Sequence, residues 1–123
     1  MIVHISTNSS SMSMRITRHE GIMYICLDDV ISLSSSKTKF KLSNENIEEI
    51  FDIIGEKEFI KLDYGSVSEP LPSISYDGLK KLIECSNIKD YLHKDDLVII
   101  YDYITRNKSK INKIMNDEIH NPF

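Results

Sequence analysis

The chain has 123 residues, of which 41% are hydrophobic, and contains only 4 glycines and 3 prolines; this composition is typical of one folded domain and excludes collagen-like or low-complexity chains. No apolar run reaches the roughly 18 residues of a membrane helix, and the first residues lack the basic and apolar segments of a secretory signal, so we expect a protein that is not secreted. The net charge of −4 argues against a uniformly basic nucleic-acid binder.

The charge is unevenly distributed along the sequence. Residues 1–42 and residues 104–123 each carry a net charge of +2, whereas residues 43–77 carry −7. One face of the folded domain is therefore expected to be able to meet phosphates while another repels them.

In the N-terminal third, the hydrophobic pattern predicts strands. Residues 2–5 are expected to form a short strand, and residues 6–12 a polar lead-in. Alternation over 12–17 and the β-branched and aromatic run at 22–26 predict a hairpin that turns at Glu20-Gly21, because glycine readily adopts the positive φ of a tight turn. Asp28 or Asp29 is then expected to cap a short helix.

The remaining two thirds alternate between helices and extended segments. The periodicity predicts a helix from Ser43 to Gly55, strands at 58–63 and 73–74, a helix capped by Ser75, and a last helix from Asp95 that continues through Met115. This order indicates an α+β fold in which a small antiparallel sheet, the N-terminal hairpin plus later strands, packs with about four helices. The side chains expected to be mutually buried are Ile50, Phe51, Leu79, Leu82, Ile83, Leu97, Ile100 and Tyr101.

Motifs for catalysis or cofactor binding are absent from the sequence. The carboxylate pairs Asp28-Asp29 and Asp95-Asp96 open predicted helices, where capping explains them. Cys26 and Cys85 lie in apolar stretches and are expected to be reduced core thiols. The four histidines show no metal-ligand spacing. We therefore expect no catalytic residues, no metal, no cofactor and no enzymatic activity.

Basic residues are the remaining candidates for function. Arg15 and Arg18 belong to the predicted hairpin, although strand alternation does not place both on one face. Lys37, Lys39 and Lys41 surround Phe40, and such a loop is suited to phosphate contact and stacking. The alternative is a solvated loop with Phe40 in the core. A further basic group lies near the C-terminus at Arg106, Lys108, Lys110 and Lys113.

Two stretches of the sequence carry motif residues. The first stretch closes the hairpin with Tyr24, Ile25, Asp29 and Val30. The second stretch carries Ile74, Ser75, Gly78, Leu79, Leu82, Ile83 and Ser86. Together they resemble the BRO-N domain of large DNA viruses and phage antirepressors. The resemblance implies a BRO-N-like α+β domain over 13–106, preceded at 1–12 by a flexible lead-in or short edge strand and followed at 107–123 by a basic helical extension.

The resemblance implies a non-enzymatic viral or phage regulatory protein that binds DNA in the host-cell cytoplasm or nucleus. The residues predicted to contact DNA are Arg15, Arg18, Lys37, Lys39, Phe40, Lys41, Lys80 and Lys81. The alternative is an acidic interaction module that antagonises a host defence or regulatory protein through Glu45, Glu48, Glu49 and Asp52. The partner is thus DNA or a host protein, without a membrane, and self-association into a homo-oligomer stays open.

Overall fold

The computed structural model describes residues 2–6, 11–34, 44–64, 69–85 and 92–120. The strands are β1 (Ile2–Ser6), β2 (Ser11–His19), β3 (Ile22–Cys26), β4 (Phe59–Leu62) and β5 (Leu71–Ser75). The helices are α1 (Leu27–Ser34), α2 (Asn44–Ile54), the short 3₁₀ helix η1 (Glu56–Glu58), α3 (Tyr76–Glu84), α4 (Lys94–Arg106) and α5 (Lys108–His120). The predicted α+β class is confirmed, and no helix in these ranges is both long and apolar enough to cross a bilayer.

All five strands form one antiparallel sheet in the order β1-β2-β3-β5-β4. The predicted hairpin is confirmed: His19 pairs with Ile22, and the two residues between them form the turn. Glu20 and Gly21 both have positive φ, at 50° and 79°, as a turn that matches the strand twist requires. Gly55 also has positive φ, at 89°, where it ends α2 as predicted.

The strand portions of the two motif stretches, in β3 and β5, are neighbours in the sheet. Tyr24 of β3 is in register with Ser75 of β5, and Ile25 with Ile74. Ser75 also caps α3 as predicted, because its hydroxyl oxygen accepts a hydrogen bond from the Gly78 N–H at 2.9 Å. The same hydroxyl donates to the carboxylate of Glu58, so Ser75 joins β5, α3 and η1.

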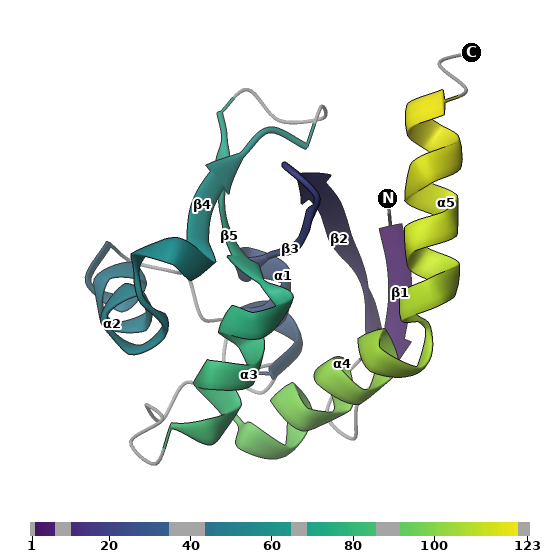
Figure 1. Cartoon of the computed structure of the whole chain (residues 1–123). Coiled ribbons are helices and arrows are strands. Elements are labelled where there is room, and N and C mark those ends of the chain that lie inside the picture. Colours follow the sequence, from purple (N-terminus) through teal and green to yellow (C-terminus); the bar gives the residue numbers. More distant parts are fainter. Residues whose placement is uncertain (1, 7–10, 35–43, 65–68, 86–91, 121–123) are drawn as a thin grey trace.

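The helices pack on one face of the sheet (Figure 1). Strand alternation and register place Val3, Met14, Ile16, Ile25 and Ile74 on that face, and all five are buried. The opposite face carries Arg15 and Tyr24 among other side chains.

The predicted core is confirmed in part. The buried members are Ile50, Leu79, Leu82, Leu97 and Ile100. The prediction of full burial is wrong for Phe51, Ile83 and Tyr101, which are partly exposed at the margins of their helix stripes. Likewise Cys26 is buried as predicted, whereas Cys85 follows the end of α3 and is only half-buried.

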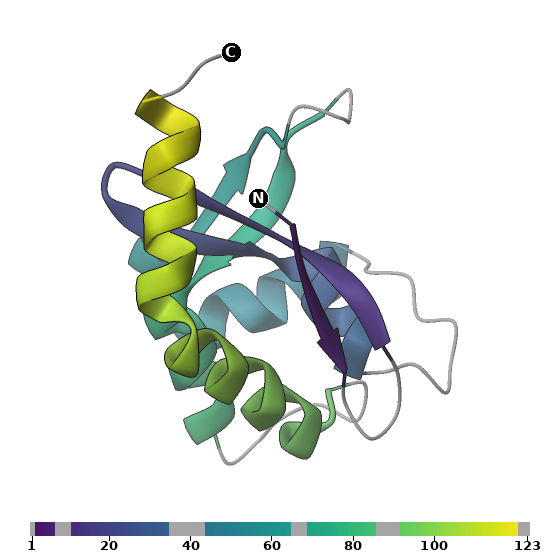
Figure 2. The same cartoon turned by 90° about the vertical axis from the view of Figure 1, so that its right-hand side faces the viewer.

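The predicted continuous C-terminal helix is instead two helices. Asn107 separates α4 from α5, and the two axes turn sharply away from one another (Figure 2). The bend places Ile111 and Met115 of α5 in the hydrophobic core between the sheet and the helices. Residues 107–115 are therefore integrated into the fold.

Candidate nucleic-acid interface

Arg15 lies in β2, where a buried carboxylate binds it. Its Nε and Nη2 donate to the two oxygens of Asp29 at 2.9 Å each, and its main-chain N–H donates to Asp29 Oδ2 at 2.8 Å. The hydrogen bond to Asp29 raises the pKa of Arg15, outweighing burial, which lowers it. The guanidinium carbon also lies 5.8 Å from the centre of the Tyr64 ring. The charge of Arg15 is thus neutralised within the fold.

Asp29 was expected to cap α1, and this prediction is corrected. Both carboxylate oxygens of Asp29 bond to Arg15 instead. At the end of β3, burial raises the pKa of the Cys26 thiol to about 11, and the main chain of Asp29 opposes this rise.

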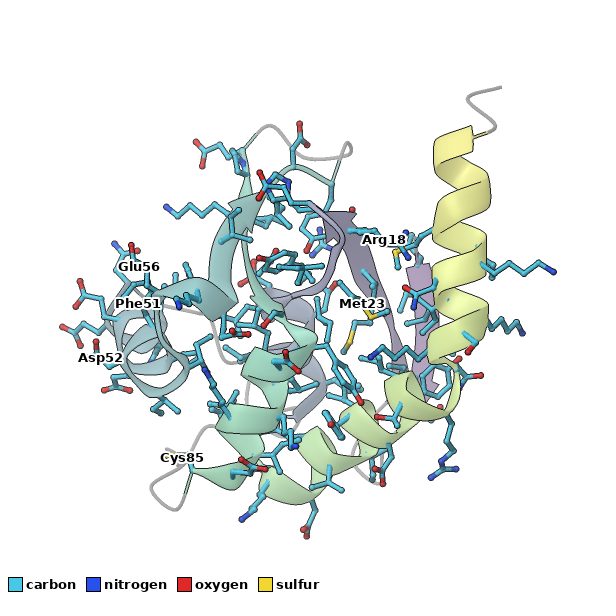
Figure 3. All side chains as sticks on the ribbon, in the orientation of Figure 1. Arg18, Met23, Phe51, Asp52, Glu56 and Cys85 are labelled. Carbon is cyan, nitrogen blue, oxygen red and sulfur yellow. The ribbon has the colours of Figure 1, made fainter. Side chains whose placement is uncertain are left out.

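Arg18 points to the other face of β2, as strand alternation predicted. Its Nη2 donates to Asn112 Oδ1 at 2.7 Å and so links the hairpin to α5 (Figure 3). On this side a half-open pocket of about 230 Å³ separates the hairpin turn from the starts of α3 and α5. Its lining residues are Gly21, Ile22, Met23, Ser75, Tyr76, Asp77, Lys108 and Asn112.

The predicted contact residues on α3 lie apart from Arg18. Lys80 and Lys81 are exposed on α3, and Lys81 Nζ lies 3.5 Å from the Ile54 carbonyl oxygen and 4.0 Å from Glu58 Oε1, beside the end of α2. Lys37, Lys39, Phe40 and Lys41 lie outside the described residues. Among the described residues, Arg15, Arg18, Lys80 and Lys81 therefore do not form one patch.

A denser basic surface lies on α5 and the bend before it. Four exposed side chains, Arg106, Lys108, Lys110 and Lys113, define this basic elbow. Residues 103–115 contain no aspartate or glutamate. Helical periodicity predicts these residues as part of a C-terminal extension, because it does not encode the bend that packs α5 onto the domain.

Aromatic contacts hold the basic elbow in place. The rings of Tyr76 and Tyr101 stack with centroids 4.8 Å apart, and Lys108 Nζ lies 4.6 Å from the centre of the Tyr76 ring. The hydroxyls of Tyr76 and Thr105 share a hydrogen bond. The hydrogen bond with Tyr76, together with burial, raises the pKa of Tyr101 to about 12. Lys108 is therefore partly a structural residue.

The acidic residues predicted to meet a protein partner lie on α2. Glu45, Glu48 and Asp52 are exposed, and Glu49 is half-buried. Ile50 and Ile54 face the core from the opposite side of the helix. Asp52 and Glu56 are directed outward on the side of the molecule farthest from α5 (Figure 3). The molecule is thus polarised between an acidic α2 and the basic elbow.

Clusters suited to metal binding are not found in the described ranges, where no three histidine, cysteine or carboxylate side chains come together. Of the second carboxylate pair, Asp96 is buried at the start of α4, with Oδ2 3.6 Å from His93 Nδ1. The buried carboxylates Asp29 and Asp96 each face a basic side chain.

The comparisons with known proteins add no relative. No protein-family model matches the chain, and no curated protein and no solved structure matches it either.

Proposed function

We propose that this protein is a non-enzymatic regulatory module of the BRO-N type that binds double-stranded DNA through its basic elbow. The observation that carries the proposal is the separation of charge. Arg106, Lys110 and Lys113 are exposed at the end of α4 and on α5, whereas Glu45, Glu48 and Asp52 are exposed on α2, and α2 and α5 lie on opposite sides of the molecule (Figure 1). A phosphate backbone can approach the α5 side without meeting the α2 side, so the net charge of −4 does not prevent binding.

Fluorescence anisotropy of a labelled duplex, measured across salt concentrations, tests this proposal. The variant carries Arg106→Glu, Lys110→Glu and Lys113→Glu and keeps Lys108, which packs on Tyr76. Each phosphate contact that is lost should reduce the salt slope by about 0.9, and the triple variant should bind at least about tenfold more weakly.

The control variant carries Lys57→Glu and Lys61→Glu. Lys57 is exposed in η1, beside the acidic α2, and Lys61 is exposed in β4. This control changes the net charge in the same direction and should retain duplex binding. The proposal fails if wild type does not bind duplex at about 50 mM salt, or if the control loses as much affinity as the elbow variant.

A second DNA contact is predicted from the sequence, at Lys37, Lys39, Phe40 and Lys41. Replacing the three lysines with glutamate should weaken duplex binding further, with a separate decrease in the salt slope. An unchanged slope would remove this loop from the proposed interface.

The second candidate function is docking of a host defence or regulatory protein on α2. It is favoured by one specific observation: Glu45, Glu48 and Asp52 form an exposed stripe on a helix that has no basic residue. Glu48→Lys combined with Asp52→Lys should abolish nuclease-resistant capture of that partner from host lysate and leave duplex binding intact or stronger.

A further inference from the structure

Among the described strands β1 is an edge of the sheet, and its own sequence contains none of the residues that usually protect an edge. Among the described strands it pairs only with β2. In Figure 2 it lies in front of β2, with its outer side toward the viewer. Its five residues include no charged residue, proline or glycine, which are the residues that commonly prevent an edge from pairing with another chain. Ile2 is 67% exposed, the highest value among the large hydrophobic residues described.

The register shows which main-chain groups of β1 face outward at its start. The Arg15 N–H donates to Asp29, which follows β3, so this N–H points away from β1. Ile2 is in register with Arg15. In an antiparallel pair, positions where the two residues bond to each other alternate with positions where both direct their N–H and C=O groups away. Because the Arg15 N–H points away from β1, Arg15 and Ile2 form a pair of the second kind. The N–H and C=O of Ile2 are therefore directed to the outer side of the sheet.

A pocket adjoins this edge. It has a volume of about 220 Å³ and lies between β1 and the bend from α4 into α5. Its lining residues are Ile2, Val3, His4, Tyr103, Asn107, Lys110, Ile111 and Ile114. Four of these side chains are aliphatic, and Lys110 is exposed at the pocket, with Arg106 nearby in sequence.

We propose that the outer edge of β1 and this pocket, together called the β1 groove, dock an extended segment of a partner protein that carries an aliphatic anchor beside acidic residues. The partner's main chain continues the sheet at the β1 edge, its aliphatic side chain fills the pocket, and its carboxylates face Lys110 and Arg106. Charge complementarity favours this occupant over a second copy. Two copies paired about a two-fold axis at β1 bring the two basic elbows toward each other.

The experiment uses the full chain and a phage-displayed library of random dodecapeptides. Selection should enrich peptides with alternating aliphatic residues and adjacent acids, and the best of them is then synthesised for fluorescence polarisation. Ile2→Pro removes the outward N–H, and Ile2→Ser removes the apolar side chain. Each should weaken peptide binding by about tenfold or more. Lys110→Glu should have a similar effect that fades as salt is raised.

Ile22→Ser is the matched control, because Ile22 is the other exposed large hydrophobic residue, at 47%, and lines the pocket beside Arg18 instead. This variant should bind the peptide like wild type. If Ile2→Pro fails to fold, as judged by circular dichroism, Ile2→Ser decides the test. The proposal is overturned if no peptide is enriched, if the Ile2 variants bind like wild type, or if sedimentation shows a dimer that Ile2→Ser dissociates.

Discussion

At the residue scale, the Asp29 side chain accepts a main-chain hydrogen bond that a neighbouring strand would usually accept. The β2–β3 register extends only to Ile16 and Ile25, so Arg15 lies just beyond it, where β3 turns into α1. The Asp29 carboxylate accepts the Arg15 N–H and binds the guanidinium of the same residue. One buried side chain therefore completes the main-chain hydrogen bonding and neutralises a charge.

Asp29→Asn should consequently destabilise the fold by about 3 kcal/mol, since it leaves the Arg15 guanidinium without its counter-charge. Urea unfolding at neutral pH measures the loss. Asp28→Asn is the neighbouring control. Burial and the charge of Asp29 raise the pKa of Asp28, so its ionised form is the less favoured one in the fold.

For Asp28 the native state binds the proton more tightly than the unfolded state, and its ionisation therefore reduces stability as pH rises through the raised pKa. Asp28→Asn should remove that penalty and leave stability equal or higher at neutral pH. Equal destabilisation by the two variants would contradict a specific role for the Arg15–Asp29 pair.

The two cysteines should differ in reactivity under native conditions. Burial raises the pKa of Cys26 to about 11, so few thiolates form near neutral pH, and the thiol is covered. Cys85 is half-buried beyond the end of α3. Ellman's reagent should label one thiol quickly and the second only on unfolding, and Cys85→Ser should remove the fast phase. Two fast phases would contradict the packing around Cys26.

At the element scale, the junction of β5, α3 and η1 depends on the absence of a side chain. A Cβ on Gly78 would lie 2.9 Å from Glu58 Cβ and 3.2 Å from Ser75 Oγ, the atom that caps α3. Glycine therefore permits η1 to approach the first turn of α3.

Gly78→Ala should destabilise the protein by about 1–3 kcal/mol through this overlap, although alanine favours a helix by about 1 kcal/mol. Thermal unfolding provides the measurement. Lys80→Ala, on the exposed side of the same helix, should change stability by less than about 0.5 kcal/mol. A stabilised Gly78→Ala protein would show that η1 is free to move away.

Local signals made some elements predictable from sequence. Glu20-Gly21 and Ser75 act through their own backbone neighbourhoods, so a single sequence is enough to place the hairpin and the start of α3. The bend at Asn107 is different. The apolar spacing of Ile104 and Ile111 equals two helical turns, and only packing on the sheet distinguishes two helices from one.

The candidate site was less predictable for the same reason. Arg15 and Lys110 are both basic in sequence, yet one is bound by a carboxylate 14 residues away and the other is exposed. Such pairings between distant elements determine which charges remain available, and neither composition nor periodicity reveals them.

At the scale of the whole molecule, the separation of charge should be visible in chromatography. The wild-type protein should bind both heparin and an anion exchanger at low salt, because each matrix meets one end of the molecule. Lys110→Glu with Lys113→Glu should abolish retention on heparin alone, whereas Glu48→Lys with Asp52→Lys should weaken retention on the anion exchanger alone. Loss of both together would show that net charge, and not its placement, governs binding.

The position of α5 also has a consequence for synthesis. Val3 and Met14 belong to strands that are synthesised before α5, and the Ile111 and Met115 side chains of α5 complete their cluster. At roughly 5–20 residues per second, a ribosome leaves the first strands without that cover for on the order of ten seconds. The nascent β1–β2 segment is therefore expected to expose its apolar face until α5 has emerged.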